Sequence, residues 1–129
     1  MSSLSASFEL PPVRSSVPTA RHVLQELLRA WAAPQDHDDA ALLVTELVSN
    51  VIDHVGGAAT LTVEASSSGD WLRIGVVDGS AVPPVVQELD SARPRGRGLR
   101  MLQLIASRWG HDDLDDGKRV WFELEPSGL

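Results

Sequence analysis

Apolar residues recur at helical spacing in three parts of the chain. The pattern predicts helices over Pro18–Trp31, Asp38–Val55 and Gly98–Trp109. In the middle helix the apolar positions form one arc of a helical wheel: Ala40, Val44, Leu47, Val48, Val51, Ile52 and Val55. The opposite side is polar, with Leu42 and Leu43 beside it, and it holds Asp39, Glu46, Asn50 and Asp53. This helix is therefore expected to carry a core face and a separate polar face.

Alternating apolar and polar residues predict four strands, over Ser5–Leu10, Thr60–Ala65, Trp71–Val77 and Arg119–Glu125. Two prolines follow the first strand and favour a sheet edge for it. The segment SSSGD before Trp71 is typical of a hairpin, and Asp36 can cap the middle helix. The order of elements predicts an α/β (α+β) two-layer sandwich, in which about three helices cover one face of a mixed, largely antiparallel sheet.

Composition narrows the class of protein. The 129 residues, 43% of them hydrophobic, fit a single domain over residues 1–129, with a core over about residues 8–125 and short flexible termini. The absence of cysteine excludes disulfides and thiolate zinc sites. The formal net charge of −7 opposes non-specific binding to nucleic acid or an anionic membrane. Without a membrane-spanning apolar run or a secretory signal, we expect a cytoplasmic protein.

Three polar features stand apart from the core pattern. Glu46 and Asn50 lie one helical turn apart, and Asp78-Gly79 ends a predicted strand. The glycines of Gly96-Arg97-Gly98 come just before the last predicted helix, after a loop over Ser80–Arg97 with little periodicity. Each feature alone has a structural explanation, as a solvated helix face, a turn or a loop. Glycines at a helix start also let backbone N–H groups approach phosphate oxygens.

Taken in order, these segments resemble a known family. ELVSNVIDH, VVDGS, GRGLRMLQLIASRWG and GKRVWFEL are similar to the successive nucleotide-binding motifs of the GHKL ATPases, which include gyrase, Hsp90, histidine kinases and MutL. The resemblance is greatest to small stand-alone bacterial members, the anti-sigma-factor serine kinases, and covers roughly Phe8–Leu124. It implies a Bergerat-type ATP-binding fold.

The resemblance implies roles for individual residues. Asn50 is expected to ligate Mg²⁺ together with ATP phosphates, because a neutral amide oxygen suits this hard cation. Glu46 is expected to act as general base towards a serine hydroxyl or a water. Asp78 is expected to accept a hydrogen bond from the adenine amino group. The phosphate-binding lid is expected to include Arg95, Gly96, Arg97, Gly98 and Leu99. Nearby positions expected at the pocket are Gly79, Asp53 and His54.

The sequence also departs from the family pattern. After Asp78-Gly79 neither of the later glycines of the usual adenine motif is present. Gly117-Lys118 stands where many relatives have Gly-Thr, and we expect Lys118 to be an exposed turn lysine rather than a phosphate ligand.

The resemblance favours an ATP-dependent protein serine/threonine kinase that binds a sigma factor and phosphorylates an antagonist protein, with ATP and Mg²⁺ as cofactors. Exposed Trp31 or Trp71 would suit a homodimer. The alternative is an ATP-binding regulatory module with little or no kinase activity. The detached catalytic half of a histidine kinase is disfavoured, since the chain has no room for a dimerising helical hairpin. Direct nucleic-acid binding is disfavoured by the net charge.

Overall fold

The computed structural model describes residues 3–55, 60–78, 97–115 and 117–127, and the side chains of residues 54, 55 and 97–99 lie outside that description. The described elements, in chain order, are β1 (Ser3–Leu10), α1 (Ser16–Ala30), α2 (His37–Val55), β2 (Leu61–Ser68), β3 (Trp71–Asp78), α3 (Arg97–Ile105), β4 (Arg108–Leu114) and β5 (Gly117–Leu124).

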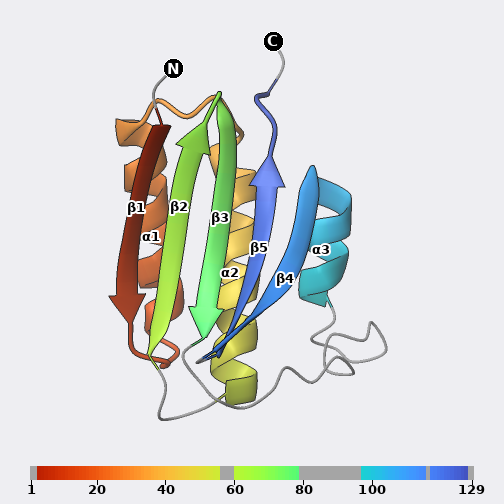
Figure 1. Cartoon of the computed structure of the whole chain (residues 1–129). Coiled ribbons are helices and arrows are strands. Elements are labelled where there is room, and N and C mark those ends of the chain that lie inside the picture. The colour runs from red at the N-terminus through yellow and green to blue at the C-terminus, as the bar shows by residue number, and fades with distance from the viewer. Residues whose placement is uncertain (1–2, 56–59, 79–96, 116, 128–129) are drawn as a thin grey trace.

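The five strands form one sheet in the order β1-β2-β3-β5-β4, and every neighbouring pair is antiparallel (Figure 1). The predicted edge position of β1 is confirmed. The turn between β2 and β3 is shorter than predicted and consists of Gly69 and Asp70. Both residues have positive φ, 57° and 67°, as a two-residue hairpin turn with the right-handed twist of the strands requires.

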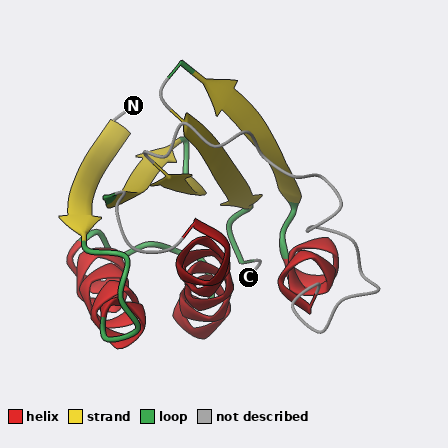
Figure 2. Ribbon diagram, turned by 90° about the horizontal axis from the view of Figure 1, so that it is seen from below, coloured by secondary structure: helices red, strands yellow, loops and turns green. Residues whose placement is uncertain are grey.

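The helices lie together on one face of the sheet, which confirms the predicted two-layer sandwich (Figure 2). The core fills the space between the layers, and its largest fully buried side chains are Phe122, Leu24, Leu28, Leu43, Leu61, Leu72, Ile74 and Leu102. The predicted alternation holds in β3 and β5, where Leu72, Ile74 and Phe122 point into this core. Among the residues that the structure describes, no helix covers the other face of the sheet, the uncovered face.

The cap predicted for α2 is confirmed. The Asp36 carboxylate accepts hydrogen bonds from the backbone N–H groups of Asp38 and Asp39, at 2.9 and 3.1 Å. Just before it, the side-chain amide of buried Gln35 donates to the backbone oxygens of Asp70 and Leu124, with 3.1 Å to Leu124. These contacts fix the start of α2 against the turn between β2 and β3 and against the end of β5.

The predicted end of the third helix is wrong. The helix ends at Ile105 rather than Trp109, and residues 108–114 form the edge strand β4, which the sequence pattern did not reveal. Ser107 N–H donates to the Glu123 oxygen at 2.9 Å, so pairing with β5 begins immediately after the helix. Trp109 packs against the core from β4. The four-residue spacing from Ile105 to Trp109 matches one helical turn, which is why the sequence pattern extended the helix too far.

Candidate functional site

Several predicted site residues lie where element ends meet. The C-terminal ends of α2 and β3 and the N-terminal ends of α3 and β5 lie at the same end of the molecule, the lower end in Figure 1. Asp78 is the last residue of β3, and α3 begins at Arg97. The fold therefore brings together the helix that carries Asn50, the strand that carries Asp78 and the helix that follows the predicted lid.

Of the predicted site residues on α2, Asn50 borders the core, whereas Glu46 lies nearer the solvent-facing side. Leu43, expected beside the polar cluster, is fully buried, and both Glu46 and Asn50 are partly buried. On a wheel of about 100° per residue, Asn50 falls only about 20° from Leu43. The solvent-facing side of α2 is occupied by Leu42, which is 36% exposed. Glu46 and Asn50 therefore do not form the fully solvated helix face that a purely structural explanation would require.

Helix α2 contacts both α1 and α3, which lie on either side of it in Figure 1. An α-helix is right-handed, and the buried arc of α2 faces the sheet. Helix geometry then predicts that the flank with Leu43, Glu46 and Asn50 turns towards α3, and the flank with Ala41 and Thr45 towards α1. The predicted metal and base residues would thus lie between two helices.

Asp53 lies on the last turns of α2, and its side chain is 19% exposed. It forms an ion pair of 3.6 Å with Arg14, which precedes α1 and is almost fully exposed. An ion pair with one exposed partner contributes little to stability. The contact ties the segment after β1 to the end of α2 where the site is predicted. His54 belongs to the same helix, but its side chain lies outside the described residues.

Asp78 is a buried carboxylate with 1% exposure. It lies on the helix-covered face of the sheet, in register with Leu61 of β2 and Lys118 of β5. Lys118 is partly buried within β5. The expectation that Lys118 is an exposed turn lysine is therefore wrong, because β5 begins one residue earlier, at Gly117.

The predicted lid lies mostly outside the described residues. The structure does not describe Gly79, Arg95 and Gly96. The first turn of α3 contains Arg97, Gly98 and Leu99, whose side chains lie outside the description. Among the described residues, no three His, Asp or Glu side chains converge on a possible metal position. A magnesium ligand set there would need oxygens from elsewhere, as a nucleotide supplies.

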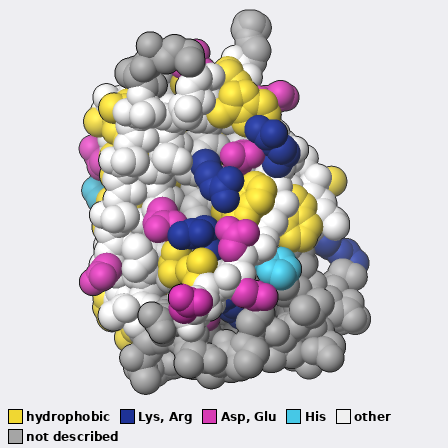
Figure 3. All heavy atoms as spheres, in the orientation of Figure 1, with side chains coloured by type: hydrophobic (Ala, Val, Ile, Leu, Met, Phe, Trp, Pro, Cys, Tyr) yellow, Lys and Arg dark blue, Asp and Glu magenta, His cyan; other side chains and the backbone are white. Residues whose placement is uncertain are grey.

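The uncovered face of the sheet carries a different polar surface, which sequence reasoning missed (Figure 3). Arg119 pairs with Glu64 at 2.8 Å, Arg108 pairs with Glu123 at 2.8 Å, and the Arg73 guanidinium lies 4.1 Å from the centre of the Trp121 ring. Hydrogen bonding to Glu64 raises the pKa of Arg119 above its ordinary value. This network of ion pairs is hard to predict from sequence, because it depends on the strand order β2-β3-β5-β4.

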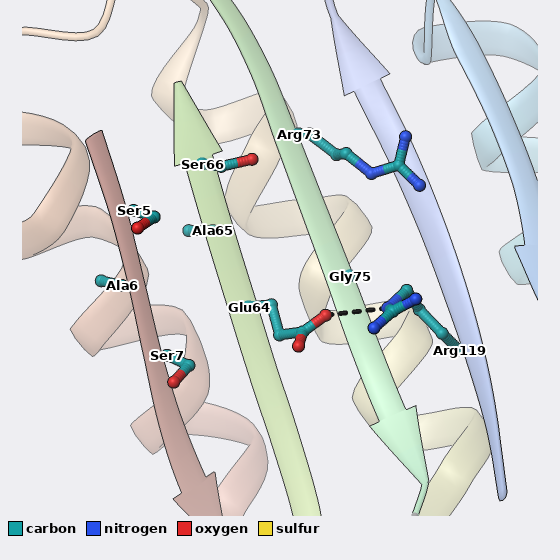
Figure 4. A pocket seen from close by; sticks show the side chains of 9 residues that line it. All are labelled: Ser5, Ala6, Ser7, Glu64, Ala65, Ser66, Arg73, Gly75 and Arg119. Carbon is teal, nitrogen blue, oxygen red and sulfur yellow. Dashed lines mark hydrogen bonds and ion pairs between the residues drawn. The ribbon is translucent and has the colours of Figure 1, made fainter. Parts of the chain in front are cut away.

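A hollow of about 490 Å³ lies beside this network (Figure 4). Its lining comes from β1, β2, β3 and β5: Ser5, Ala6, Ser7, Glu64, Ala65, Ser66, Arg73, Gly75 and Arg119. Two of the charged side chains at its wall, Arg119 and Glu64, pair with each other, and the third, Arg73, pairs with Glu123 outside the hollow. The hollow includes none of the predicted site residues and is on the opposite face of the sheet from Asp78.

The two tryptophans expected to be exposed are not. Trp31 is partly buried and packs against the core, and the Arg108 guanidinium covers the ring of Trp71 at 4.3 Å. The exposed large hydrophobic side chains in the described ranges are Leu4, Val13, Leu42 and Leu104. None of the described helices is long and apolar enough to cross a membrane.

A model of the histidine kinase-like ATPase domain family matches residues 10–124. The chain is also similar to a protein of Streptomyces coelicolor, itself uncharacterized, with 36% identity over 89 residues that cover 66% of this chain and 82% of that protein. The family match runs from the last residue of β1 to the last residue of β5.

Proposed function

The chain belongs to the histidine kinase-like ATPase domain family, and from that premise we propose that it binds ATP with Mg²⁺ at the end of the molecule where α2, β3, α3 and β5 meet. The single observation that carries the proposal is the family match over residues 10–124, which contains every residue assigned to the site. The match supports an ATP-binding regulatory module. Its detailed activity is the proposal developed below.

The residues present suit a magnesium nucleotide. Asp78 is a buried acceptor at a strand end, and a carboxylate there can accept the hydrogen bonds of an exocyclic amino group. Asn50 offers a neutral oxygen on a partly buried flank of α2. Mg²⁺ bound by one protein oxygen takes further ligands from phosphates and waters, and it neutralises charge on the transferring phosphoryl group. Gly98 lies in the first turn of α3, where free backbone N–H groups favour anions.

We assign Glu46 as the general base of a protein serine/threonine kinase. It lies one turn before Asn50 on the same flank of α2 and is partly buried. Its carboxylate would accept the proton of a substrate serine hydroxyl. The hydroxyl oxygen then bonds to the γ-phosphorus as the bond to the bridging oxygen breaks, and ADP leaves. The protein substrate in this proposal is an antagonist of an anti-sigma factor, and the second partner is a sigma factor.

Isothermal titration calorimetry with MgATP tests the binding step. We expect Asp78→Asn to weaken ATP binding about 10- to 100-fold, because it replaces a charged acceptor of a buried hydrogen bond. We expect Asn50→Ala to remove the dependence of binding on Mg²⁺. Asp112→Asn is the matched control, because Asp112 pairs with Arg119 on the uncovered face of the sheet. Equal affinity of Asp78→Asn and Asp112→Asn would refute the site.

Transfer of labelled phosphate from ATP to a candidate antagonist tests the kinase step. We expect Glu46→Ala to abolish transfer while ATP binding persists. Equal transfer by both proteins would remove Glu46 from the role of base. The second candidate function is a regulatory module with little or no turnover, which the absence of both later glycines after Asp78-Gly79 favours. ATP binding by the wild type with no transfer to any candidate would select it.

A further inference from the structure

Lys118 lies directly opposite Asp78 in the antiparallel pair of β3 and β5. Along β5 it alternates with Arg119 and shares the face of Val120 and Phe122, which is the helix-covered face. Asp78 is 1% exposed and Lys118 is partly buried. A hydrogen-bond acceptor and a hydrogen-bond donor are thus neighbours on the same face at one end of the sheet.

The distance between Asp78 and Lys118 and their hydrogen-bonding roles follow from the register. Side chains directly opposite each other on antiparallel strands have Cβ atoms about 4.5–5.5 Å apart. A lysine ammonium has three donors and no acceptor, and an ionised aspartate has only acceptors. On its other side Lys118 faces Asp113 of β4, which is exposed, so solvent screens that charge. The buried neighbour of Lys118 in this row of the sheet is Asp78.

We propose that Lys118 is a second base-recognition residue, whose ammonium donates a hydrogen bond to N1 of the adenine that Asp78 holds by its 6-amino group. The inference rests on the proposed function, since it requires adenine at Asp78. The Watson–Crick edge of adenine presents a donor at N6 beside an acceptor at N1. This order matches an acceptor at Asp78 and a donor at Lys118.

The same pair disfavours guanine and hypoxanthine. Both bases carry an acceptor at O6 and a donor at N1, so in the adenine pose O6 would face the Asp78 carboxylate and N1–H would face the Lys118 ammonium. An acceptor would then face an acceptor and a donor would face a donor, and such mismatches give strong discrimination. A threonine at position 118 could donate or accept and would discriminate less. Lysine here therefore increases selectivity for adenine.

A comparison of two nucleotides on two proteins, in the manner of a double-mutant cycle, tests this contact. Calorimetry compares ATP with 1-deaza-ATP, in which a C–H group replaces N1, on the wild type and on Lys118→Met. We expect the wild type to bind 1-deaza-ATP about 10- to 100-fold more weakly than ATP, the range for a hydrogen bond with one charged partner. We expect Lys118→Met to bind ATP more weakly by a similar factor and to bind both nucleotides equally.

The control is Arg119→Met, the next residue of β5, whose side chain lies on the uncovered face and pairs with Glu64. It should keep the preference for ATP over 1-deaza-ATP. Lys118→Gln retains an N–H donor and is expected to keep part of this preference, which serves as a second variant if Lys118→Met folds poorly by circular dichroism.

Three outcomes overturn the inference, and they differ from failure of the proposed function. Unchanged ATP affinity in Lys118→Met excludes the contact. A variant that loses affinity equally for both nucleotides but still prefers ATP places the ammonium elsewhere, for example on a phosphate. A wild type that binds ATP and 1-deaza-ATP equally excludes recognition of N1. If Asp78→Asn loses ATP binding while one of these three outcomes is observed, the inference about Lys118 is wrong and the proposed function stands. A wild type that binds no ATP refutes both the inference and the proposed function.

Discussion

Replacing Gly110 by alanine would put a methyl group where the indole of Trp121 lies. Gly110 of β4 is directly opposite Trp121 of β5. A Cβ atom at position 110 would lie 2.8 Å from Cζ2 and 3.1 Å from Cε2 of that ring. Real Cβ atoms do not approach other heavy atoms to 2.8 Å, so either the ring or the strand must move. The Arg73 guanidinium, 4.1 Å from the ring centre, hinders movement of the ring.

The expected loss follows from overpacking. Forcing an extra carbon into a packed site destabilises a protein by about 1–3 kcal/mol, which here exceeds the gain of about 0.4–1 kcal/mol from replacing glycine at an ordinary φ. We therefore expect Gly110→Ala to lower the free energy of unfolding by about 1–2 kcal/mol. For a domain of this size that corresponds to a decrease in Tm of about 3–8 °C.

Gly75→Ala is the matched control, because Gly75 also lies on the uncovered face of the sheet. Its Cβ would meet Cδ and Cγ of Arg119 at 3.3 and 3.4 Å. Gly75 is buried, but the arginine side chain is flexible and can shift by the few tenths of an ångström required, so we expect a change within about 0.5 kcal/mol of the wild type. Urea unfolding monitored by far-UV circular dichroism gives the free energy of unfolding for each variant.

A double-mutant cycle identifies the cause. If the indole is the obstacle, Gly110→Ala should cost little in a Trp121→Val background. Equal stability of Gly110→Ala and Gly75→Ala, or the same cost of Gly110→Ala with and without Trp121, would refute this explanation.

Three further predictions concern the start of α2. Asp36→Ala should lower the free energy of unfolding by about 1 kcal/mol, because the N–H groups of Asp38 and Asp39 lose their N-cap acceptor. Asp36→Asn keeps an acceptor and should lower the free energy of unfolding much less. Equal losses in the two variants would contradict the cap. Burial raises the pKa of the Asp39 carboxyl, and the charges of Asp36 and Asp38 raise it further. Ionisation of Asp39 therefore opposes folding, and stability from this group is lost as the pH rises through that pKa. Asp36→Asn should lower the Asp39 pKa in an NMR titration, and an unchanged pKa would exclude the charge of Asp36 as a cause. Gln35→Met should destabilise the protein by about 1–3 kcal/mol in urea unfolding, because the buried Leu124 oxygen and the partly buried Asp70 hydrogen bond lose their donor. Exposed Gln103→Met should have little effect, and equal effects would refute a role for the Gln35 hydrogen bonds.

Much of the fold follows from hydrophobic periodicity. The three helices, four of the five strands, the edge position of β1 and the Asp36 cap were all predictable, because long apolar patterns and a capping residue act locally. Strand β4 was not predictable, because its inward positions are Trp109, His111 and Asp113, and only the first is apolar. Long-range pairing with β5 determines this strand, and the pattern of one segment does not contain that information.

The residues of the candidate site remain a prediction from the sequence, whereas their surroundings come only from the structure. A wheel identified Glu46 and Asn50 as polar positions, yet it could not show that Leu43 beside them is fully buried, because that depends on the neighbouring helices and the sheet. The position of Lys118 opposite Asp78 depends on strand register, which one sequence does not specify. The polar network on the uncovered face was missed for the same reason.

The position of the nucleotide can be measured directly by NMR. Addition of MgATP to the ¹⁵N-labelled protein should shift the backbone amide signals of Asn50, Asp78 and Lys118, because these residues border the proposed pocket. The signals of Ser5, Ser66 and Arg73, which line the hollow on the uncovered face, should stay in place. Shifts concentrated at Ser5, Ser66 and Arg73, or no shifts at saturating MgATP, would contradict the account.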